Sequence, residues 1–177
     1  MTGQVIWITG LSGAGKTTLA SAVARQLRQS KLPVVVLDGD VLREVFGEIH
    51  SHGRDARLAL SLKYAHLSRT IANQGITVLI ATISLFREVH IWNRENLPLY
   101  FEVFLDVSID ELRRRDSKGL YRAFDAGEIH NVAGLDLSID YPDNPDFKID
   151  DSCIISIEDL ASKLIERLNS KGGKCVS

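Results

Sequence analysis

The chain has 177 residues, of which 45% are hydrophobic and 25% are charged, and its net charge at pH 7 is −2. These values are typical of one soluble globular domain and argue against nonspecific nucleic-acid binding as its main function. No hydrophobic run reaches the roughly 18 residues that a membrane span needs, and the first residues lack the basic region of a signal peptide. We therefore expect a cytoplasmic protein with no nucleic-acid or membrane partner. Cys153 and Cys175 form no C-x-x-C pair and are expected to be reduced thiols.

Short hydrophobic runs alternate with helical stretches along the whole chain. The runs are rich in Val, Ile and Leu without polar alternation, which is typical of parallel strands that are covered on both faces. The predicted strands are Val5–Thr9, Val34–Asp38, Thr77–Thr82, Phe101–Val107 and Phe147–Asp150. The predicted helices lie near 15–29, 40–47, 55–74, 86–96, 109–115 and 157–169. This alternation predicts an α/β fold with three layers, α/β/α, around a mainly parallel sheet.

The segment from 116 to 145 differs from the rest because it is polar and contains several glycines and prolines. A long irregular segment in a compact domain is usually a functional loop or a lid, although a plain surface loop is the alternative. Neither an internal repeat nor an interdomain linker is visible. We therefore predict one domain over residues 1–170, with a lid at about 116–140 and a flexible C-terminal tail at 171–177.

Residues 5–18 read VIWITGLSGAGKTT and contain the complete phosphate-binding pattern G-x-x-x-x-G-K-[ST]. The pattern lies between a predicted strand and a predicted helix, where backbone N–H groups and the helix N-terminus converge on phosphate oxygens. Lys16 supplies a positive charge for the terminal phosphates, and the hydroxyl of Thr17 is a ligand for Mg²⁺. The predicted ATP-binding residues of the loop are Gly10, Ser12, Gly13, Ala14, Gly15, Lys16, Thr17 and Thr18.

Two carboxylates, Asp38 and Asp40, follow the second predicted strand. In open α/β sheets, ligands bind beyond the carboxyl ends of the strands. Carboxylates in this place suit the ordering of Mg²⁺, here by Asp38 with Thr17, and the acceptance of a proton from an attacking hydroxyl, for which we favour Asp40 with Asp38 as the second candidate. The alternative is a simple turn in which Asp40 caps the following helix.

Arginines downstream of the aspartates are candidates for binding an anionic substrate. Arg43 and Arg57 carry guanidinium groups, which bind phosphate-like anions through paired donors, although solvated helix positions are the alternative. The cluster at 113–115 either complements a helix dipole or supplies one arginine to the migrating phosphate. The histidines form no metal-binding spacing; His52 is a candidate on the acceptor side.

Taken together, these residues resemble the adenylylsulfate kinase family, a family with the P-loop kinase fold. The matching stretches are Gly10–Thr18, Leu37–Asp40 with Arg43, Ile83-Ser84 with Phe86-Arg87, Phe101–Phe104, Arg115–Tyr121, Ala126–Ile129 and Gly134 with Asp136. The resemblance implies transfer of the γ-phosphate of ATP, with Mg²⁺, to the ribose 3′-hydroxyl of adenylyl sulfate. It also implies that Arg115 and Lys118 contact ATP, and that Asp40, Arg43, Arg57, Ile83, Ser84 and Leu120 contact the acceptor. Kinases of this family are often dimers, which leaves a homodimer open.

The chain departs from the family pattern mainly in the residues expected around the acceptor. Val41, Leu85 and Val132 replace the usual Asn, Pro and Phe, and Ala59, Leu60 and Leu62 replace a Glu, an Asn and an Arg. Loss of a base-stacking ring at Val132 and of a hydrogen-bonding amide at Leu60 changes which acceptors can be satisfied. We therefore expect an activated nucleotide other than adenylyl sulfate as the acceptor. The sequence resembles the branch of the family that acts on cytidine diphosphoramidate in capsule modification, which implies a cytidine-type acceptor; adenylyl sulfate is the alternative.

Three other functions fit parts of the sequence. A GTPase switch requires the tetrad Asn-Lys-x-Asp, which the chain lacks. A catalytically inactive nucleotide-binding module is disfavoured by the retained Lys16, Thr17, Asp38 and Asp40. A kinase for an unrelated small metabolite, such as a sugar acid, would keep the ATP half and need no nucleotide acceptor.

Overall fold

A computed structural model of the chain describes residues 2–47, 53–116, 118–153 and 155–171. Its strands are β1 (Val5–Gly10), β2 (Val34–Asp38), β3 (Thr77–Thr82), β4 (Phe101–Asp106) and β5 (Phe147–Asp150). Its helices are α1 (Lys16–Gln29), α2 (Gly39–Val45), α3 (Arg54–Ala72), α4 (Arg87–Asn96), α5 (Ile109–Arg115), α6 (Leu120–Asp125) and α7 (Ile157–Lys171). All five predicted strands and all six predicted helices are present, with boundaries shifted by at most a few residues.

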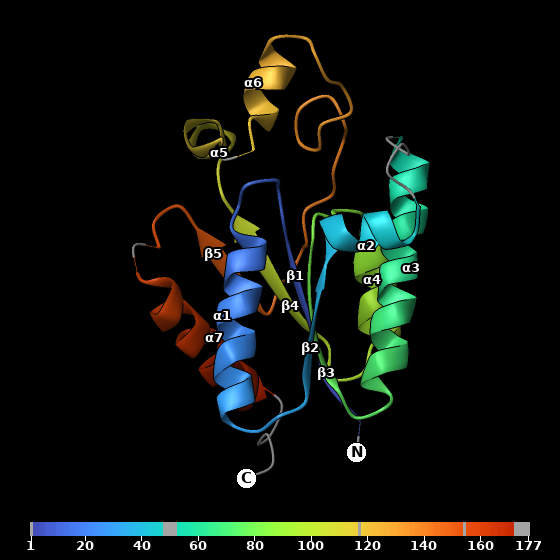
Figure 1. Cartoon of the computed structure of the whole chain (residues 1–177), viewed down its shortest axis with the longest axis vertical. Helices are drawn as coiled ribbons and strands as arrows, with labels where there is room; N and C mark the ends of the chain where they lie inside the picture. Colours follow the sequence, from blue (N-terminus) through green and yellow to red (C-terminus); the bar gives the residue numbers. More distant parts are fainter. Residues whose placement is uncertain (1, 48–52, 117, 154, 172–177) are drawn as a thin grey trace.

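The five strands form one parallel sheet in the order β2-β3-β1-β4-β5. Helices α1 and α7 cover one face, and α2, α3 and α4 cover the other (Figure 1). The structure therefore confirms the predicted three-layer α/β/α architecture. None of the described helices is long and hydrophobic enough to cross a membrane.

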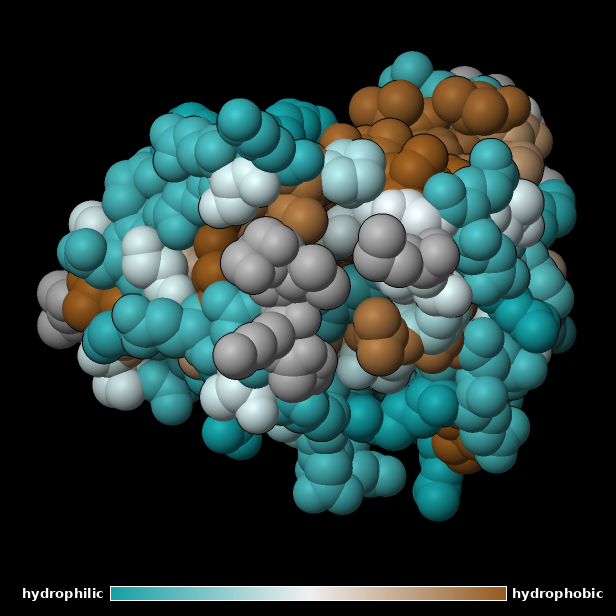
Figure 2. Space-filling view, turned by 90° about the horizontal axis from the view of Figure 1, so that it is seen from below, coloured by the Kyte–Doolittle hydropathy of each residue, from teal (hydrophilic) through white to brown (hydrophobic). Residues whose placement is uncertain are grey.

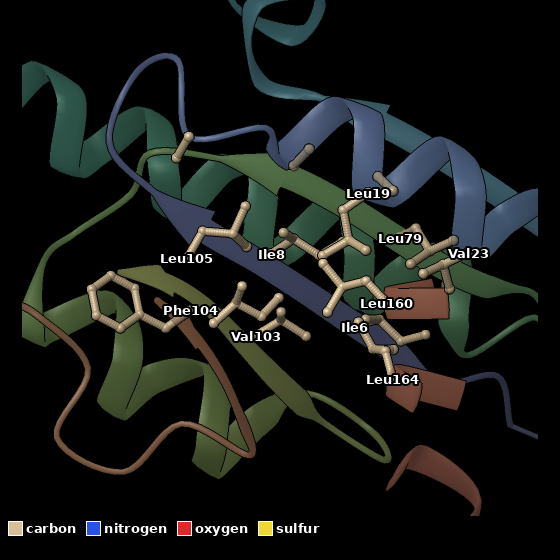
Figure 3. Close-up of a cluster of buried hydrophobic side chains, with 14 of the residues drawn as sticks. Ile6, Ile8, Leu19, Val23, Leu79, Val103, Phe104, Leu105, Leu160 and Leu164 are labelled. Carbon is tan, nitrogen blue, oxygen red and sulfur yellow. The ribbon is translucent and has the colours of Figure 1, made fainter. Parts of the chain in front are cut away.

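Alternate residues of β1 explain why the strands show no polar alternation. Ile6 and Ile8 point into the core between the sheet and α1 with α7, whereas Val5 and Trp7 belong to the core beneath α3 and α4. All four side chains are fully buried. The close-up in Figure 3 labels Ile6, Ile8, Leu19, Val23, Leu79, Val103, Phe104, Leu105, Leu160 and Leu164 in the first of these cores. Burial on both faces fixes β1 and, with it, the position of the loop that follows it.

Helix α6 is the one described helix that the sequence analysis missed, and it lies in the segment predicted as an irregular lid. Its first turn depends on Asp116, whose carboxylate accepts hydrogen bonds from the N–H groups of Tyr121 and Arg122, both at 3.1 Å. Gly119 precedes the helix with a φ of 68°, a left-handed conformation that glycine adopts without strain. Only six residues long, α6 carries too little hydrophobic periodicity to be detected from sequence.

The start of β1 and the end of α7 lie at the lower end of the molecule, while α5, α6 and the adjoining segment lie at its upper end (Figure 1). Figure 2 shows the lower end, where most of the surface is hydrophilic and hydrophobic atoms gather at the upper right of the view. Helix α7 ends at Lys171, and the rest of the predicted flexible tail, with Cys175, lies outside the described residues.

Candidate active site

The site lies at the upper edge of the sheet in Figure 1, where the parallel strands β1, β2 and β3 end. A narrow cavity of about 70 Å³ there adjoins a wider one of about 640 Å³. The two cavities share the lining residues Ser12, Asp40, Arg43, Arg57, Ile83, Lys118 and Ala133. The loop after β1, the turn after β2, the end of β3 and the lid thus converge on one space.

The loop between β1 and α1 is shaped by its glycines. Gly10, Gly13 and Gly15 have φ values of 151°, 80° and 94°, which side-chain-bearing residues rarely adopt. At Gly10 a Cβ atom would also lie 2.7 Å from the carbonyl oxygen of Leu105. Helix α1 begins after Gly15 without a side-chain cap and without an acidic residue in its first turn. Its first N–H groups are therefore available to an anion.

Lys16 lies at the start of α1 with its ammonium group turned back over the loop. Its Nζ donates a hydrogen bond to the carbonyl oxygen of Leu11 at 2.7 Å. Burial lowers the pKa of Lys16 to about 8, while the nearby Asp40 carboxylate acts in the opposite direction. Phosphate groups at this place would restore the electrostatic support that burial removes. The ammonium is held by a single backbone contact and is placed to exchange it for phosphate oxygens.

Asp38 connects the phosphate loop to the turn after β2. Its Oδ2 accepts a hydrogen bond from the Thr17 hydroxyl at 2.6 Å, and its Oδ1 accepts one from the N–H of Asp40 at 2.8 Å. Asp38, and not Asp40, is therefore the N-cap of α2, which corrects the alternative considered from the sequence. Hydroxyl and carboxylate oxygens side by side next to a phosphate loop form a donor pair of the kind that Mg²⁺ uses together with substrate phosphates. No cluster of three or more His, Cys, Asp or Glu side chains suited to a metal occurs among the described residues.

Asp40 faces the lid and is largely exposed, with 72% of its side chain accessible. Its Oδ2 accepts a hydrogen bond from Lys118 at 2.5 Å, and this bond is the main reason why the pKa of Asp40 lies below its ordinary value. Asp40 is therefore ionised at neutral pH and can accept a hydrogen bond from a hydroxyl group. A depressed pKa suits a carboxylate that orients a hydroxyl better than one that removes its proton completely.

Two half-buried arginines, Arg43 of α2 and Arg57 of α3, line both cavities. The Nε atom of Arg43 is buried and has no hydrogen-bond partner among the described residues. Arg57 donates to the carbonyl oxygen of Asn131 at 2.8 Å, and burial together with the charge of Arg43 lowers its pKa. Two neighbouring cations whose charges disfavour each other form a natural site for an anion.

The segment predicted as a lid contacts the phosphate loop through Tyr121 and the turn after β2 through Lys118. Tyr121 donates from its hydroxyl to the carbonyl oxygen of Ser12 in the phosphate loop at 2.9 Å. Asp136 shapes the opposite arm by accepting hydrogen bonds from the N–H groups of Asn131 and Val132 at 2.8 and 2.6 Å. The side chains of Leu120 and Val132 line the wider cavity. The lid thus contributes walls to the space in which an acceptor would bind.

Most of the predicted site residues are brought together, but not all. Those that line the cavities are Ser12, Gly13, Lys16, Asp38, Asp40, Arg43, Arg57, Ile83, Ser84, Lys118 and Leu120. Gly10, Ala14, Gly15, Thr17 and Thr18 belong to the loop and the start of α1 without lining either cavity. Arg115 pairs with Glu111 at 2.7 Å and does not line the cavities. His52 lies outside the described residues.

The sequence analysis missed several lining residues, among them Ser61, Tyr64 and Thr82. Ser61 and Tyr64 follow Arg57 at spacings of four and seven residues, so all three share one face of α3. That spacing was a usable signal once Arg57 had been chosen as a candidate. Thr82 carried no such signal, because its place at the end of a buried strand depends on the register of the sheet.

The model of the family described as adenylylsulphate kinase matches residues 2–150. The chain belongs to this family. Its members are kinases, and the fold, the phosphate loop and the lining of the cavities agree with this. As an adenylylsulfate kinase family protein, the chain is an ATP-dependent kinase that transfers phosphate to a hydroxyl group.

Relatives within the family carry two different names. Cytidine diphosphoramidate kinase of Campylobacter jejuni is 37% identical over 164 residues, which cover 93% of this chain and 95% of that protein. Adenylyl-sulfate kinase of Deinococcus deserti is 37% identical over 167 residues, with 94% and 92% covered. A structure of the Mycobacterium tuberculosis APS kinase CysC in complex with AMPPNP and APS superposes with a TM-score of 0.88 at 33% identity, covering 95% of this chain and 98% of that one.

Proposed function

We propose that this kinase transfers the γ-phosphate of ATP to the ribose 3′-hydroxyl of a cytidine-type activated nucleotide, cytidine diphosphoramidate. The observation that carries the proposal is the lining of the acceptor cavities. Leu60 lines the narrow cavity and Val132 the wider one, and both side chains are buried, at 3% and 6% exposure. An aliphatic wall offers a purine base neither stacking nor amide hydrogen bonds. The similarity to the Campylobacter jejuni kinase supports the same acceptor.

In the proposed mechanism, the N–H groups of the loop and the ammonium of Lys16 hold the β- and γ-phosphates of ATP. Thr17 and Asp38 would hold Mg²⁺, which neutralises charge on the phosphates. Asp40 orients the 3′-hydroxyl toward the γ-phosphorus after releasing Lys118. The hydroxyl oxygen forms a bond to phosphorus as the bond to the bridging oxygen of ADP breaks, and ADP leaves with that electron pair. The hydroxyl proton passes to Asp40 or to solvent.

Arg43 and Arg57 hold the anionic arm of the acceptor in this proposal. The buried, unpartnered Nε of Arg43 supports this assignment because a buried donor is costly until an acceptor meets it. The lid at 116–140 then excludes water and limits hydrolysis of ATP. This activity would place the protein in the cytoplasm, in the modification of capsular polysaccharide.

The alternative acceptor is adenylyl sulfate. The similarity of this chain to adenylyl-sulfate kinases of the family supports this alternative. A coupled ADP-release assay with ATP and Mg²⁺ should be run with cytidine diphosphoramidate and adenylyl sulfate in parallel. We expect a higher kcat/KM for the cytidine compound. A strong preference for adenylyl sulfate would overturn the proposed acceptor and place the protein in sulfate activation.

A matched variant sharpens this assay. The double substitution Leu60→Asn and Val132→Phe restores the residues usual in the family. We expect it to raise kcat/KM for adenylyl sulfate relative to the cytidine compound by about 10-fold or more, the range of one stacking contact with a base. Leu99→Asn, at a residue that is 60% exposed and lines neither cavity, serves as the control. The unfolding temperature of each variant shows whether its fold is retained.

A further inference from the structure

Three hydroxyl groups form a hydrogen-bonded chain along the narrow cavity. Thr82 and Ser84 are 2.9 Å apart between their hydroxyl oxygens, and Ser84 donates to the hydroxyl of Ser61 at 2.8 Å. Ser61 in turn donates to the carbonyl oxygen of Arg57 at 2.8 Å. All three side chains are buried and line the cavity. Buried hydroxyls facing a binding cavity affect which ligand atoms can enter it.

The chain of hydroxyls has a direction. The hydroxyl of Ser61 donates its hydrogen bond to the carbonyl oxygen of Arg57, and the hydroxyl of Ser84 donates to the hydroxyl oxygen of Ser61. Because the proton of Ser84 is already used, Thr82 is the donor in the hydrogen bond between Thr82 and Ser84. Each hydroxyl carries one proton and two acceptor lone pairs, so all three protons are used within the chain. Unused lone pairs remain, so the part of the cavity wall formed by these three hydroxyls offers hydrogen-bond acceptors.

The backbone at Ser84 supports a functional role for this arrangement. Ser84 has a φ of 30°, in a region that residues other than glycine seldom occupy. Such a conformation costs free energy and is found preferentially at binding sites. Here it coincides with a side chain that bonds both Thr82 and Ser61. The position of the central hydroxyl is thus maintained at some cost to the fold.

Arg43 and Arg57 line the same narrow cavity as the three hydroxyls. An anionic arm held by the two guanidinium groups would bring its terminal atoms to the hydroxyl chain. We propose that Thr82, Ser84 and Ser61 select an acceptor whose anionic arm ends in an N–H donor. This inference rests on the proposed function, in which the arm of the acceptor ends in a phosphoramidate.

The chemical contrast between the two terminal groups is large. A phosphoramidate nitrogen carries N–H bonds that can donate to the lone pairs of the hydroxyls. A sulfate or a phosphate dianion offers only acceptor oxygens, and those that reach the hydroxyl chain, beyond the arginines, would face the lone pairs of other acceptors. A site built to bond an N–H group rejects an analogue without it, because buried polar groups are then left unpaired.

The test compares cytidine diphosphoramidate with cytidine 5′-diphosphate, which keeps the base, the ribose and the length of the arm. The diphosphate carries more negative charge, so attraction to the arginines alone would favour it. We expect the wild-type protein to prefer the phosphoramidate by at least about 10-fold in kcat/KM. Thr82→Val and Ser61→Ala should each reduce this ratio by about 5-fold or more, with the KM for ATP unchanged.

Two further variants separate specificity from structure. Thr82→Ser keeps a hydroxyl and should retain the wild-type ratio. Thr70→Val removes an exposed helix hydroxyl that bonds the carbonyl of His66 at 2.9 Å, and it serves as the matched control. Variants whose unfolding temperature matches the wild type, and whose ratio falls only when the hydroxyl chain is broken, would support the inference.

Two results would overturn it, and they differ. If the wild type uses both cytidine compounds equally well, or if Thr82→Val changes both rates by the same factor, the hydroxyl chain does not read the terminal atom and the proposed function stands. If the wild type prefers adenylyl sulfate to both cytidine compounds, the proposed function fails and the inference fails with it.

Discussion

The nucleotide side and the acceptor side of the site are built in different ways. The nucleotide side is one continuous loop from Gly10 to Thr17, whose shape depends on glycine conformations and whose contacts come largely from the backbone. The acceptor side is assembled from side chains on α2, α3, the end of β3 and the lid. A backbone-built site tolerates few changes, whereas side chains can be exchanged while the fold is kept. This difference explains how one family can keep its donor and vary its acceptor.

The clearest way to break the nucleotide side is to remove the charge of Lys16. We expect Lys16→Ala to lower kcat by at least about 10³-fold, the scale of a lost cationic contact to a transferring phosphoryl group. Measurement of ADP release with each acceptor should show the same loss, because the donor is common to all of them. A loss that depends on the acceptor would contradict the separation of the two sides. Arg25→Ala, far along α1, is the control.

Asp40 lies where the two sides meet, and its removal should affect transfer more than binding. We expect Asp40→Asn to lower kcat for transfer by about 10²–10³-fold while the Kd for ATP changes little. The amide lacks the negative charge that orients the hydroxyl and attracts its proton, but the N-cap of α2 is retained because Asp38 provides it. Near-normal turnover would move the role to Asp38 or to solvent. Lys118→Met is a useful companion, since it frees Asp40 without removing the carboxylate.

Arg43 separates the two sides most directly. We expect Arg43→Ala to lower kcat/KM for the acceptor by about 10- to 100-fold, the range for lost hydrogen bonds to a charged group, with the KM for ATP nearly unchanged. Arg114→Ala removes an exposed arginine that bonds Glu111 and should leave both constants unchanged. An equal rise of both KM values in Arg43→Ala would mean that the cation acts on the whole site and not on the acceptor alone.

The same contrast decides how far the sequence predicts the structure. The phosphate loop was predictable because its residues are contiguous in sequence and its shape depends on glycines. The strands were predictable because short hydrophobic runs mark each of them. The helix α6 was not, because it depends on the capping carboxylate of Asp116 and on Gly119. The hydroxyls of Ser61 and Thr82 are linked through that of Ser84 only after α3 packs beside β3. Side-chain contacts between distant segments follow from tertiary packing, which local pattern does not determine.

The pKa of Lys16 predicts a pH dependence confined to the nucleotide side. Burial lowers this pKa to about 8 in the free protein, and phosphates bind the protonated form. ATP affinity should therefore be constant below about pH 7 and weaken as Lys16 loses its proton, by roughly 10-fold at pH 9. Measurement of the Kd for ATP between about pH 6.5 and about pH 9.5 checks this prediction. Lys16→Arg is the control, because the pKa of arginine lies well above this pH range and the side chain keeps its charge throughout. A wild-type profile as flat as that of Lys16→Arg would contradict the assigned cause.

The smallest expected effect concerns Tyr121, which ties the lid to the phosphate loop. Burial raises the pKa of Tyr121 to about 12, so its hydroxyl stays protonated and donates to the carbonyl of Ser12 at ordinary pH. Tyr121→Phe keeps the buried ring and removes one hydrogen bond, which should lower the free energy of unfolding by about 1 kcal/mol. Because the lost contact joins lid and loop, we also expect a few-fold more ATP to be hydrolysed per acceptor phosphorylated, by the reasoning that a lid excludes water.

A lower unfolding temperature with an unchanged ratio of hydrolysis to transfer would make this bond purely structural. Tyr141→Phe is a suitable control, since Tyr141 is an exposed tyrosine that packs on Phe104 and lines neither cavity. If only Tyr121→Phe raises the hydrolysis of ATP by water, the lid acts on the nucleotide side through its hydrogen bond to the carbonyl oxygen of Ser12. The two sides would then share one moving element although they are built by different means.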